Sequence, residues 1–216
     1  MSKIASPKKK KTRQTIFSFK DLNLREGIRI AGVDEAGRGC MAGPLVCAAV
    51  ILKPGQKLTG LNDSKKLSAK QREVLYEKIT KNCVSFGVGE ISEKFIDEFG
   101  LTKAVQEGNR IAVSLLKPVP ELILIDGCDK QTITLPFRTL IKGDTLIRDI
   151  MAASIIAKVT RDRIMCDKYA LIYPEYKFEV HKGYCTRLHT ELLRKHKPCD
   201  IHRKSYTPVK ACISEI

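Results

Sequence analysis

The chain has 216 residues, 43% of them hydrophobic, so it is long enough for one substantial α/β domain and too apolar to be wholly disordered. Its 39 lysines and arginines against 24 acidic residues give a net charge of +15, which favours a polyanionic partner such as nucleic acid. The eight cysteines form no CxxC pair, and we find neither a signal peptide nor an apolar run near the ~20 residues of a membrane span, so we expect a cytoplasmic protein with reduced thiols.

The predicted elements are, in chain order, strands over 28–33 and 45–52, a helix from Ser68, a strand over 84–91, a helix over about 101–116, strands over 121–125 and 133–141, and a helix over about 149–167. Ser68 to Gln71 fits a capping box, which marks the start of the first helix. Strands that alternate with helices indicate a single α/β domain.

The two ends of the chain differ from this central pattern. Residues 1–24 are predicted to be a basic, flexible arm, since the first fourteen contain six lysines and arginines and no acidic residue. Residues 25–216 show no internal repeat and no second core, so we expect one domain. Its last part, from about residue 185, is expected to be helical and basic.

Three apolar segments of the predicted sheet end in acidic residues. Asp34 and Glu35 follow the first strand, Asp126 follows the fourth and Asp144 follows the fifth. Ligands of α/β sheets bind beyond strand ends, and four carboxylates meeting there would repel one another unless divalent cations relieved the repulsion. Oxygen ligands of this kind favour Mg²⁺ or Mn²⁺ over zinc.

The adjacency of Asp34 and Glu35 sets a condition on the first strand. Neighbouring residues of a regular strand point to opposite faces, so we expect the strand to end, bulge or turn at this pair. Each acid taken singly could instead be a solvated loop residue or a helix cap. Asp149 and Asp162 are rival candidates, which we expect to face solvent or to cap a helix.

Seven motifs occur in order between about residues 28 and 210: AGVDEAGRG at 31–39, GPLV at 43–46, LNDSKKL at 61–67, LIDG at 124–127, KGD at 142–144, AASIIAKVTRD at 152–162 and HKGY at 181–184. Together they resemble the type 2 ribonucleases H, the ribonuclease HII family. The resemblance implies a ribonuclease H-like fold, which is an α/β fold with a mixed central sheet flanked by helices and a helical C-terminal part. One departure is Cys40, where the family usually has proline, and we expect it to loosen the loop slightly.

The resemblance also implies an endonuclease that cuts RNA paired with DNA and cuts 5′ of single ribonucleotides in duplex DNA, in primer removal and ribonucleotide removal. The family's catalytic and metal-binding carboxylates carry over onto Asp34, Glu35, Asp126 and Asp144. We predict hydrolysis by two ions of Mg²⁺ or Mn²⁺, with Asp34 bridging both, to give 5′-phosphate and 3′-hydroxyl ends. The expected partners are RNA–DNA hybrids and DNA containing ribonucleotides, bound by a monomer.

Substrate-binding residues are expected around the glycine-rich motif. The backbone amides of Gly37, Arg38 and Gly39 can approach a ribose 2′-hydroxyl closely, although the same residues could form an ordinary turn. The resemblance implies that Tyr184 is a flat surface for the neighbouring deoxyribose. Phosphate contacts are predicted, with solvated loop or surface residues as the alternative, for Asn62, Ser64, Lys65, Lys66, Lys142, Lys158, Lys182 and Arg203.

Other interpretations stay open at this point. A non-catalytic nucleic-acid-binding module would use the same basic surface but would leave the strand-end acids unexplained. A junction or DNA-only endonuclease on the same fold would use both the basic surface and the strand-end acids. His196, Cys199 and His202 raise the possibility of zinc but have no fourth ligand at a suitable spacing. His181 could carry a proton or be a polar surface residue.

Overall fold

A five-stranded mixed sheet forms the centre of the computed structural model, which describes residues 24–25 and 27–214. In spatial order the strands are β3 (Ser85–Ile91), β2 (Leu45–Ile51), β1 (Ile30–Ala36), β4 (Leu122–Asp126) and β5 (Phe137–Leu140). β1 to β3 are antiparallel, whereas β4 and β5 run parallel to β1. The predicted fold class is confirmed, while the predicted arm falls almost entirely outside the described residues.

The first strand does not end at its acidic pair, and our expectation of a bulge or turn there is wrong. β1 continues through Asp34 and Glu35, which stay in register with Ala48 and Cys47 of the fully buried strand β2. This pairing keeps the backbone extended, and the chain turns only at Gly37, whose φ is +101°. The two carboxylates therefore leave opposite faces of the sheet.

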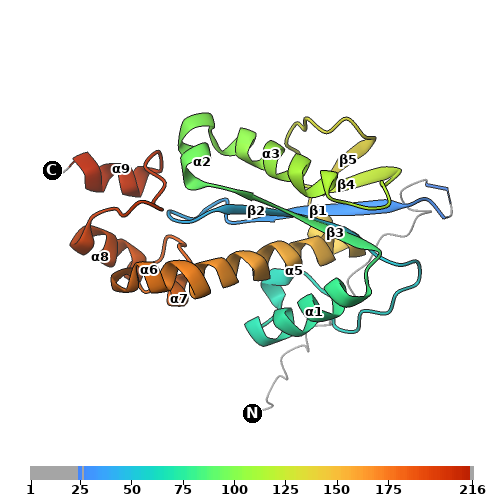
Figure 1. The fold of residues 1–216 in the computed structure, drawn as a ribbon, viewed down its shortest axis with the longest axis horizontal. Coiled ribbons are helices and arrows are strands. Elements are labelled where there is room, and N and C mark those ends of the chain that lie inside the picture. The colour runs from blue at the N-terminus through green and yellow to red at the C-terminus, as the bar shows by residue number, and fades with distance from the viewer. Residues whose placement is uncertain (1–23, 26, 215–216) are drawn as a thin grey trace, which may run out of the picture.

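Helices cover both faces of the sheet (Figure 1). One face carries α1 (Ala69–Asn82) and α5 (Arg148–Arg163), and the other carries α2 (Glu93–Phe99) and α3 (Leu101–Ser114). The predicted capping box is confirmed, because Ser68 accepts from the backbone of Gln71 and the Gln71 side chain accepts from Ser68. The short helix α2 was not predicted. Within the described residues, no helix has both the length and the apolarity needed to cross a membrane.

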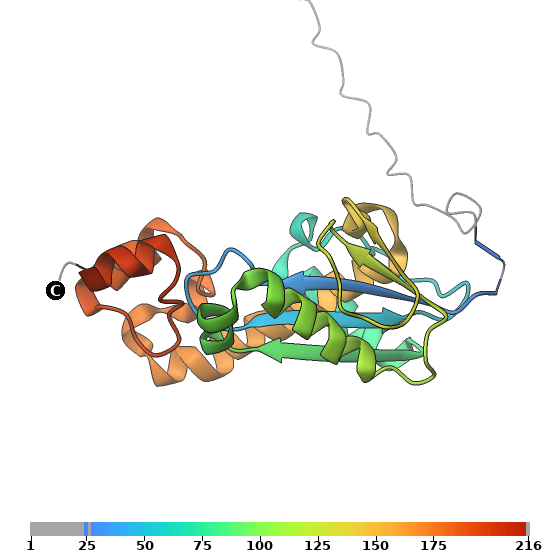
Figure 2. The same cartoon turned by 90° about the horizontal axis from the view of Figure 1, so that it is seen from above.

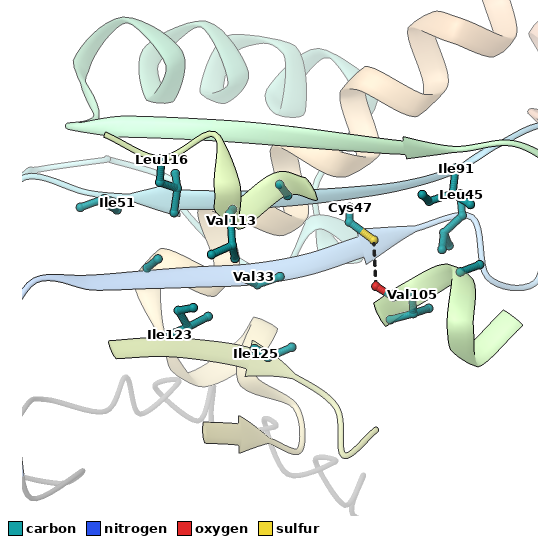
Figure 3. Packing of buried hydrophobic residues seen from close by; sticks show 14 of the residues in the cluster. Val33, Leu45, Cys47, Ile51, Ile91, Val105, Val113, Leu116, Ile123 and Ile125 are labelled. Carbon is teal, nitrogen blue, oxygen red and sulfur yellow. Dashed lines mark hydrogen bonds between the residues drawn. The ribbon is translucent and has the colours of Figure 1, made fainter. Parts of the chain in front are cut away.

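The sheet holds both helical layers at close range. Towards α3, Cys47 lies in the larger apolar cluster with its Sγ 3.9 Å from the carbonyl oxygen of Val105 (Figure 3). Towards α5, a Cβ on Gly32 would lie 2.1 Å from the backbone of Asp149, so only glycine lets the start of α5 pack directly on β1. This contact fixes α5 across the strand that carries Asp34.

The C-terminal part packs beyond the carboxyl end of β1 (Figures 1 and 2). Its elements are the π-helical segment η2 (Ile164–Tyr169), α6 (Ala170–Ile172), η3 (Pro174–Tyr176), α7 (Phe178–His181), α8 (Arg187–His196) and α9 (Thr207–Ser214). Two small apolar clusters, one around Phe178 and one around Leu193, join it to Ala42 and Met41 in the loop after β1. Irregular helical segments of this part occur from Ile164 onwards, and α8 and α9 follow the expected boundary near residue 185.

Buried histidines join the segments of this C-terminal part. His189 has its Nδ1 2.9 Å from the carbonyl oxygen of Tyr184 and its Nε2 3.1 Å from Nε2 of His202. The backbone amide of Cys199 donates to Nδ1 of His202 at 3.0 Å. These partners place the proton of His189 on Nδ1 and that of His202 on Nε2. His181 is also buried, so the surface position that we expected for it is wrong.

We expect the rings of His189 and His202 to stay neutral at about pH 5. Burial lowers the pKa of His189 to about 4 and that of His202 to about 3. In the unfolded chain the histidine pKa is about 6.5, so protonation below that pH favours the unfolded state. Above about pH 6.5 the two histidines therefore do not lower the free energy of unfolding, and below it they lower this free energy progressively as the pH falls towards 4. Two-dimensional ¹H–¹⁵N spectra should show the two assigned tautomers without titration between about pH 8 and 5. A protonated ring at about pH 6 would contradict this burial.

Candidate active site

Three carboxylates converge at the carboxyl end of the sheet. Asp34 in β1, Asp126 at the end of β4 and Asp144 in α4 (Gly143–Leu146) each offer an oxygen within 4.8 Å of the others. Parallel pairing places the residues just before Asp34 and Asp126 side by side. β5 lies on the other side of β4 and leads into α4, which brings Asp144 to the same edge.

The turn into α4 ties two of these acids together. Lys142 adopts a left-handed conformation with φ of 59°, and the next two backbone amides then point at Asp126. Oδ1 of Asp126 accepts from the backbone amide of Gly143 at 2.7 Å and from that of Asp144 at 3.4 Å. Backbone donors thus orient Asp126, while its second oxygen makes none of these bonds.

The electrostatics of the cluster call for a cation. Asp34 is 5% exposed, and burial, followed by the charges of Glu35 and Asp126, raises its pKa well above the ordinary range although the Ser154 hydroxyl hydrogen-bonds to it. Burial and the neighbouring Asp144 likewise raise the pKa of Asp126. Close carboxylates with only oxygen donors fit a hard divalent ion such as Mg²⁺ or Mn²⁺.

Lys65 supplies a positive charge at this cluster. It lies in the 3₁₀ segment η1 (Ser64–Lys66), and its Nζ is 2.9 Å from Oδ2 of the buried Asp144. This hydrogen bond raises the pKa of Lys65. The neighbouring Ser64 is buried, and its hydroxyl lies 2.9 Å from the hydroxyl of Ser154, which anchors η1 to α5.

Glu35 borders the cluster but is not one of the three converging acids. Its side chain leaves the opposite face of β1 and lies 3.4 Å from NH1 of Arg38. The same NH1 is 2.7 Å from Oδ2 of Asp129 in the loop after β4. Burial raises the pKa of Glu35, and the charge of Arg38 opposes that shift.

Asp34, Glu35 and Asp126 line a pocket of about 270 Å³, whereas Asp144 lies outside its lining. Predicted residues that line it are Asp34, Glu35, Gly37, Arg38, Gly39, Ser64, Lys65, Asp126, Lys158 and Tyr184. Five further predicted contacts lie outside this lining: Asn62, Lys66, Lys142, Lys182 and Arg203. Asn62 instead accepts from the backbone amide of Asp63, and the carbonyl of Lys182 accepts from Arg161. The predicted site is thus largely one surface.

Two buried arginines hold the glycine-rich loop, residues 37–44, which joins β1 to β2. Arg161 donates to the carbonyl oxygens of Pro44, Ala42 and Lys182 at 2.9, 3.0 and 2.8 Å. Arg203 donates to the Gly43 and Arg38 carbonyl oxygens. Both side chains are fully buried, so the predicted phosphate contact of Arg203 is wrong. Their charges are satisfied by carbonyl dipoles rather than by carboxylates.

Conformation and space explain the glycines of the loop. A Cβ on Gly37 would lie 2.3 Å from Nε of Arg161, and the positive φ disfavours any side chain there. Gly39, by contrast, faces open space, with no atom within 4 Å of an added Cβ. One glycine is therefore required by packing, and the other leaves room for a ligand.

Tyr184 borders the pocket between two cations. Nζ of Lys158 lies 4.7 Å from its ring centroid, and the guanidinium carbon of Arg161 lies 5.4 Å away. Lys158 is also 2.8 Å from Asp162, which pairs with it rather than joining the acidic cluster. Cys40 forms an isolated β-bridge with Tyr184, so the residue in place of the family's usual proline still fixes the loop.

Sequence reasoning missed Ser154, Arg72 and Asp129. Ser154 and Arg72 line the pocket, and Asp129 holds Arg38. Ser154 lies four residues before Lys158 on α5, and this helical spacing was the available signal. Nothing in the sequence pairs Asp129 with Arg38, because the contact crosses 91 residues.

The residues considered for zinc do not converge. Sγ of Cys199 lies 3.1 Å from Nδ1 of His202, but Nε2 of that ring faces His189. His196 meets the edge of the Tyr176 ring. Within the described part of the chain, the only group of three or more metal-ligating side chains is the aspartate cluster.

Comparisons with known proteins find a matching family and relatives that cover most of this chain. The family model for ribonuclease HII matches residues 31–209. A ribonuclease HII of Mycoplasma mycoides is 47% identical over 187 residues, covering 86% of this chain and 90% of that protein. One of Shewanella oneidensis is 48% identical over 189 residues, covering 85% and 90%.

Solved structures match across the fold. A ribonuclease H2 from Pyrococcus horikoshii aligns with a TM-score of 0.76 at 27% identity, over 87% of this chain and 98% of that chain. A ribonuclease HII from Archaeoglobus fulgidus, solved in complex with PCNA, aligns with a TM-score of 0.71 at 29% identity, over 83% and 96%. The similarity thus includes both the sheet and the C-terminal part.

Proposed function

The chain belongs to the ribonuclease HII family and is a ribonuclease H, and from this premise we propose that it cuts RNA–DNA hybrids and cuts 5′ of single ribonucleotides in duplex DNA. Membership sets aside a non-catalytic binding module. The observation that carries the proposal is the convergence of Asp34, Asp126 and Asp144, of which Asp34 and Asp126 line one pocket together with the exposed Arg38 and Gly39. The residues proposed for catalysis and those proposed for ribose recognition would then contact neighbouring groups of the substrate.

The family implies dependence on divalent metal, and the donor set fits Mg²⁺ or Mn²⁺. Asp34, Asp126 and Asp144 would hold the ions, and Glu35 would join them by leaving Arg38. When bound, two such ions would supply the chemistry that activates a water and stabilises the leaving 3′-oxygen. Displacement of Lys65 from Asp144 would free its ammonium group for a substrate phosphate.

Ribose recognition is proposed for the loop 37–39. Gly39 has open space at its α-carbon, and Arg38 is exposed, so backbone amides can reach a 2′-hydroxyl. Arg203 donates to the carbonyl oxygen of Arg38 within this loop, and Arg161 packs against Gly37 and donates to Ala42 just beyond it, so both would hold the loop before any substrate arrives. Tyr184, held by Lys158 and Cys40, would support the adjacent deoxyribose.

We expect cutting of a duplex with one embedded ribonucleotide and no cutting of the matched all-DNA duplex. The reason is that only the ribonucleotide offers a 2′-hydroxyl to loop 37–39. Products resolved on a denaturing gel, with Mg²⁺ or Mn²⁺ present, should begin with the ribonucleotide and carry 5′-phosphate and 3′-hydroxyl ends. Equal cutting of both duplexes would instead indicate a DNA endonuclease.

We also propose that the enzyme works as a cytoplasmic monomer in primer removal and ribonucleotide removal. The cysteines at all eight positions are unpaired, which suits a reducing compartment. A single chain supplies the carboxylates, the loop and Tyr184. Sedimentation analysis at assay concentrations, which reports the mass of the protein in solution, tests whether the enzyme is a monomer.

A further inference from the structure

A second basic pocket lies away from the carboxylates, between the loop after β2 and the last turn of α1. Its volume is about 450 Å³, and its lining includes Lys53, Lys57, Lys78 and Asn82 but no acidic residue. Within the described chain, none of these three lysines is in an ion pair, and the neighbouring Glu77 pairs with Lys81 and Arg163. Three cations without an acid make this pocket attractive to an anion.

A residue that lines the same pocket has a buried donor without an acceptor. Gln56 lines the pocket, and its Oε1 accepts from the backbone amide of Lys53 at 3.0 Å, which fixes the turn. The carbonyl oxygen of Gln56 accepts from Arg148. Nε2 of Gln56 is buried and, among the described residues, has no hydrogen-bond partner. An anionic oxygen at this position would satisfy it.

Helix α1 connects this pocket to the candidate active site. Arg72, near the start of α1, lines the carboxylate pocket, whereas Lys78 and Asn82, near its end, line the basic one. A third pocket, lined by Lys70 and by apolar residues such as Leu67 and Val74, shares Thr59 with the basic pocket. Ala48 is paired with Asp34, and β2 ends three residues later at Ile51, about 10 Å along the strand, where the loop that carries Lys53 begins.

We propose that this pocket binds backbone phosphates of the duplex that flanks the cleavage site. Phosphates of one strand recur about every 3.4 Å along the duplex axis, so for a duplex that runs in the direction of β2 a contact more than about 10 Å from Asp34 lies more than about three base pairs from the cut. The inference rests on the proposed function and extends it to a second phosphate contact on one flank of the substrate. The two lysines Lys57 and Lys78 are the residues that would carry this contact.

The test compares duplexes that carry one ribonucleotide and differ in flank length. One has about twelve base pairs on both sides, and the other two have about three on one side and twelve on the other. For the double variant K57Q/K78Q we expect KM to rise about threefold to tenfold on the long duplex and on one asymmetric duplex only, with kcat unchanged. The slope of log affinity against log salt should fall by about 1 to 2 on those same substrates.

The matched control removes two exposed lysines near the opposite face of the sheet, in the variant K94Q/K117Q. It should leave KM unchanged on all three duplexes. An equal loss in both double variants, or an equal loss of K57Q/K78Q on both asymmetric duplexes, would overturn the proposed contact. Failure of the wild-type enzyme to cut any of the duplexes would overturn the proposed function instead, so the two failures are distinguishable.

Discussion

The variant D34N is expected to lose at least about 10³-fold in cleavage rate while it keeps most of its hybrid binding. Asparagine preserves the shape of Asp34 and can still accept from the backbone amide of Glu35, which lies 2.8 Å from the carboxylate. It removes the charge that would hold both metal ions. Single-turnover cleavage and fluorescence anisotropy with a labelled hybrid separate the two effects.

Stability provides a control within the same variant. Because burial and like charges raise the pKa of Asp34, its ionisation opposes folding, and this cost grows as the pH rises from the unfolded-state pKa of about 3.9 towards the raised pKa of the folded state. A neutral asparagine avoids the cost, so in metal-free buffer at neutral pH the midpoint of thermal unfolding should be equal or higher. The exposed D167N is the matched surface control and should leave cleavage unchanged. Retained cleavage by D34N would remove Asp34 from the site.

The second large effect is expected for R161M. Arg161 is fully buried and donates to three backbone carbonyls, two in the loop after β1 and one at Lys182. Methionine fills much of the same volume but leaves these acceptors without a donor. We expect a loss of about 3 kcal/mol or more in the free energy of unfolding, measured by urea denaturation.

A nearby arginine on the same stretch of α5 serves as the comparison. Arg163 is partly exposed and pairs with Glu73 and Glu77 on the surface of α1. R163Q should cost less than about 1 kcal/mol, because surface ion pairs are screened by solvent. Equal destabilisation of R161M and R163Q would mean that the buried carbonyl contacts do not hold the loop.

The sequence was sufficient for features that depend on local pattern. The capping box at Ser68, the alternation of strands with helices, and the acids that follow strand ends all leave a signature within a few residues. Asp34, Asp126 and Asp144 could be grouped because parallel strands end at one edge. The predicted bulge failed since a strand with a fully buried partner stays regular through a charged pair.

Long-range contacts explain the remaining errors. Arg203 was assigned to phosphate by its charge, yet its hydrogen bonds reach residues more than 150 positions away. Asp129 and Arg38 are similarly distant in sequence. A charged residue that serves backbone carbonyls inside the fold has the same local pattern as one on the surface, so the sequence alone does not separate them.

The contacts of Arg161 and Arg203 with the glycine-rich loop also determine when this loop can fold during synthesis of the enzyme. A ribosome releases a chain from its N-terminus, and domains fold as they emerge. All three clustered aspartates have been synthesised by residue 144, but the loop lacks its last buried partner until Arg203 is added near the end of translation. Formation of the loop proposed to recognise ribose is therefore coupled to completion of synthesis, and a truncated chain would keep the acids but would lack the contact that shapes this loop.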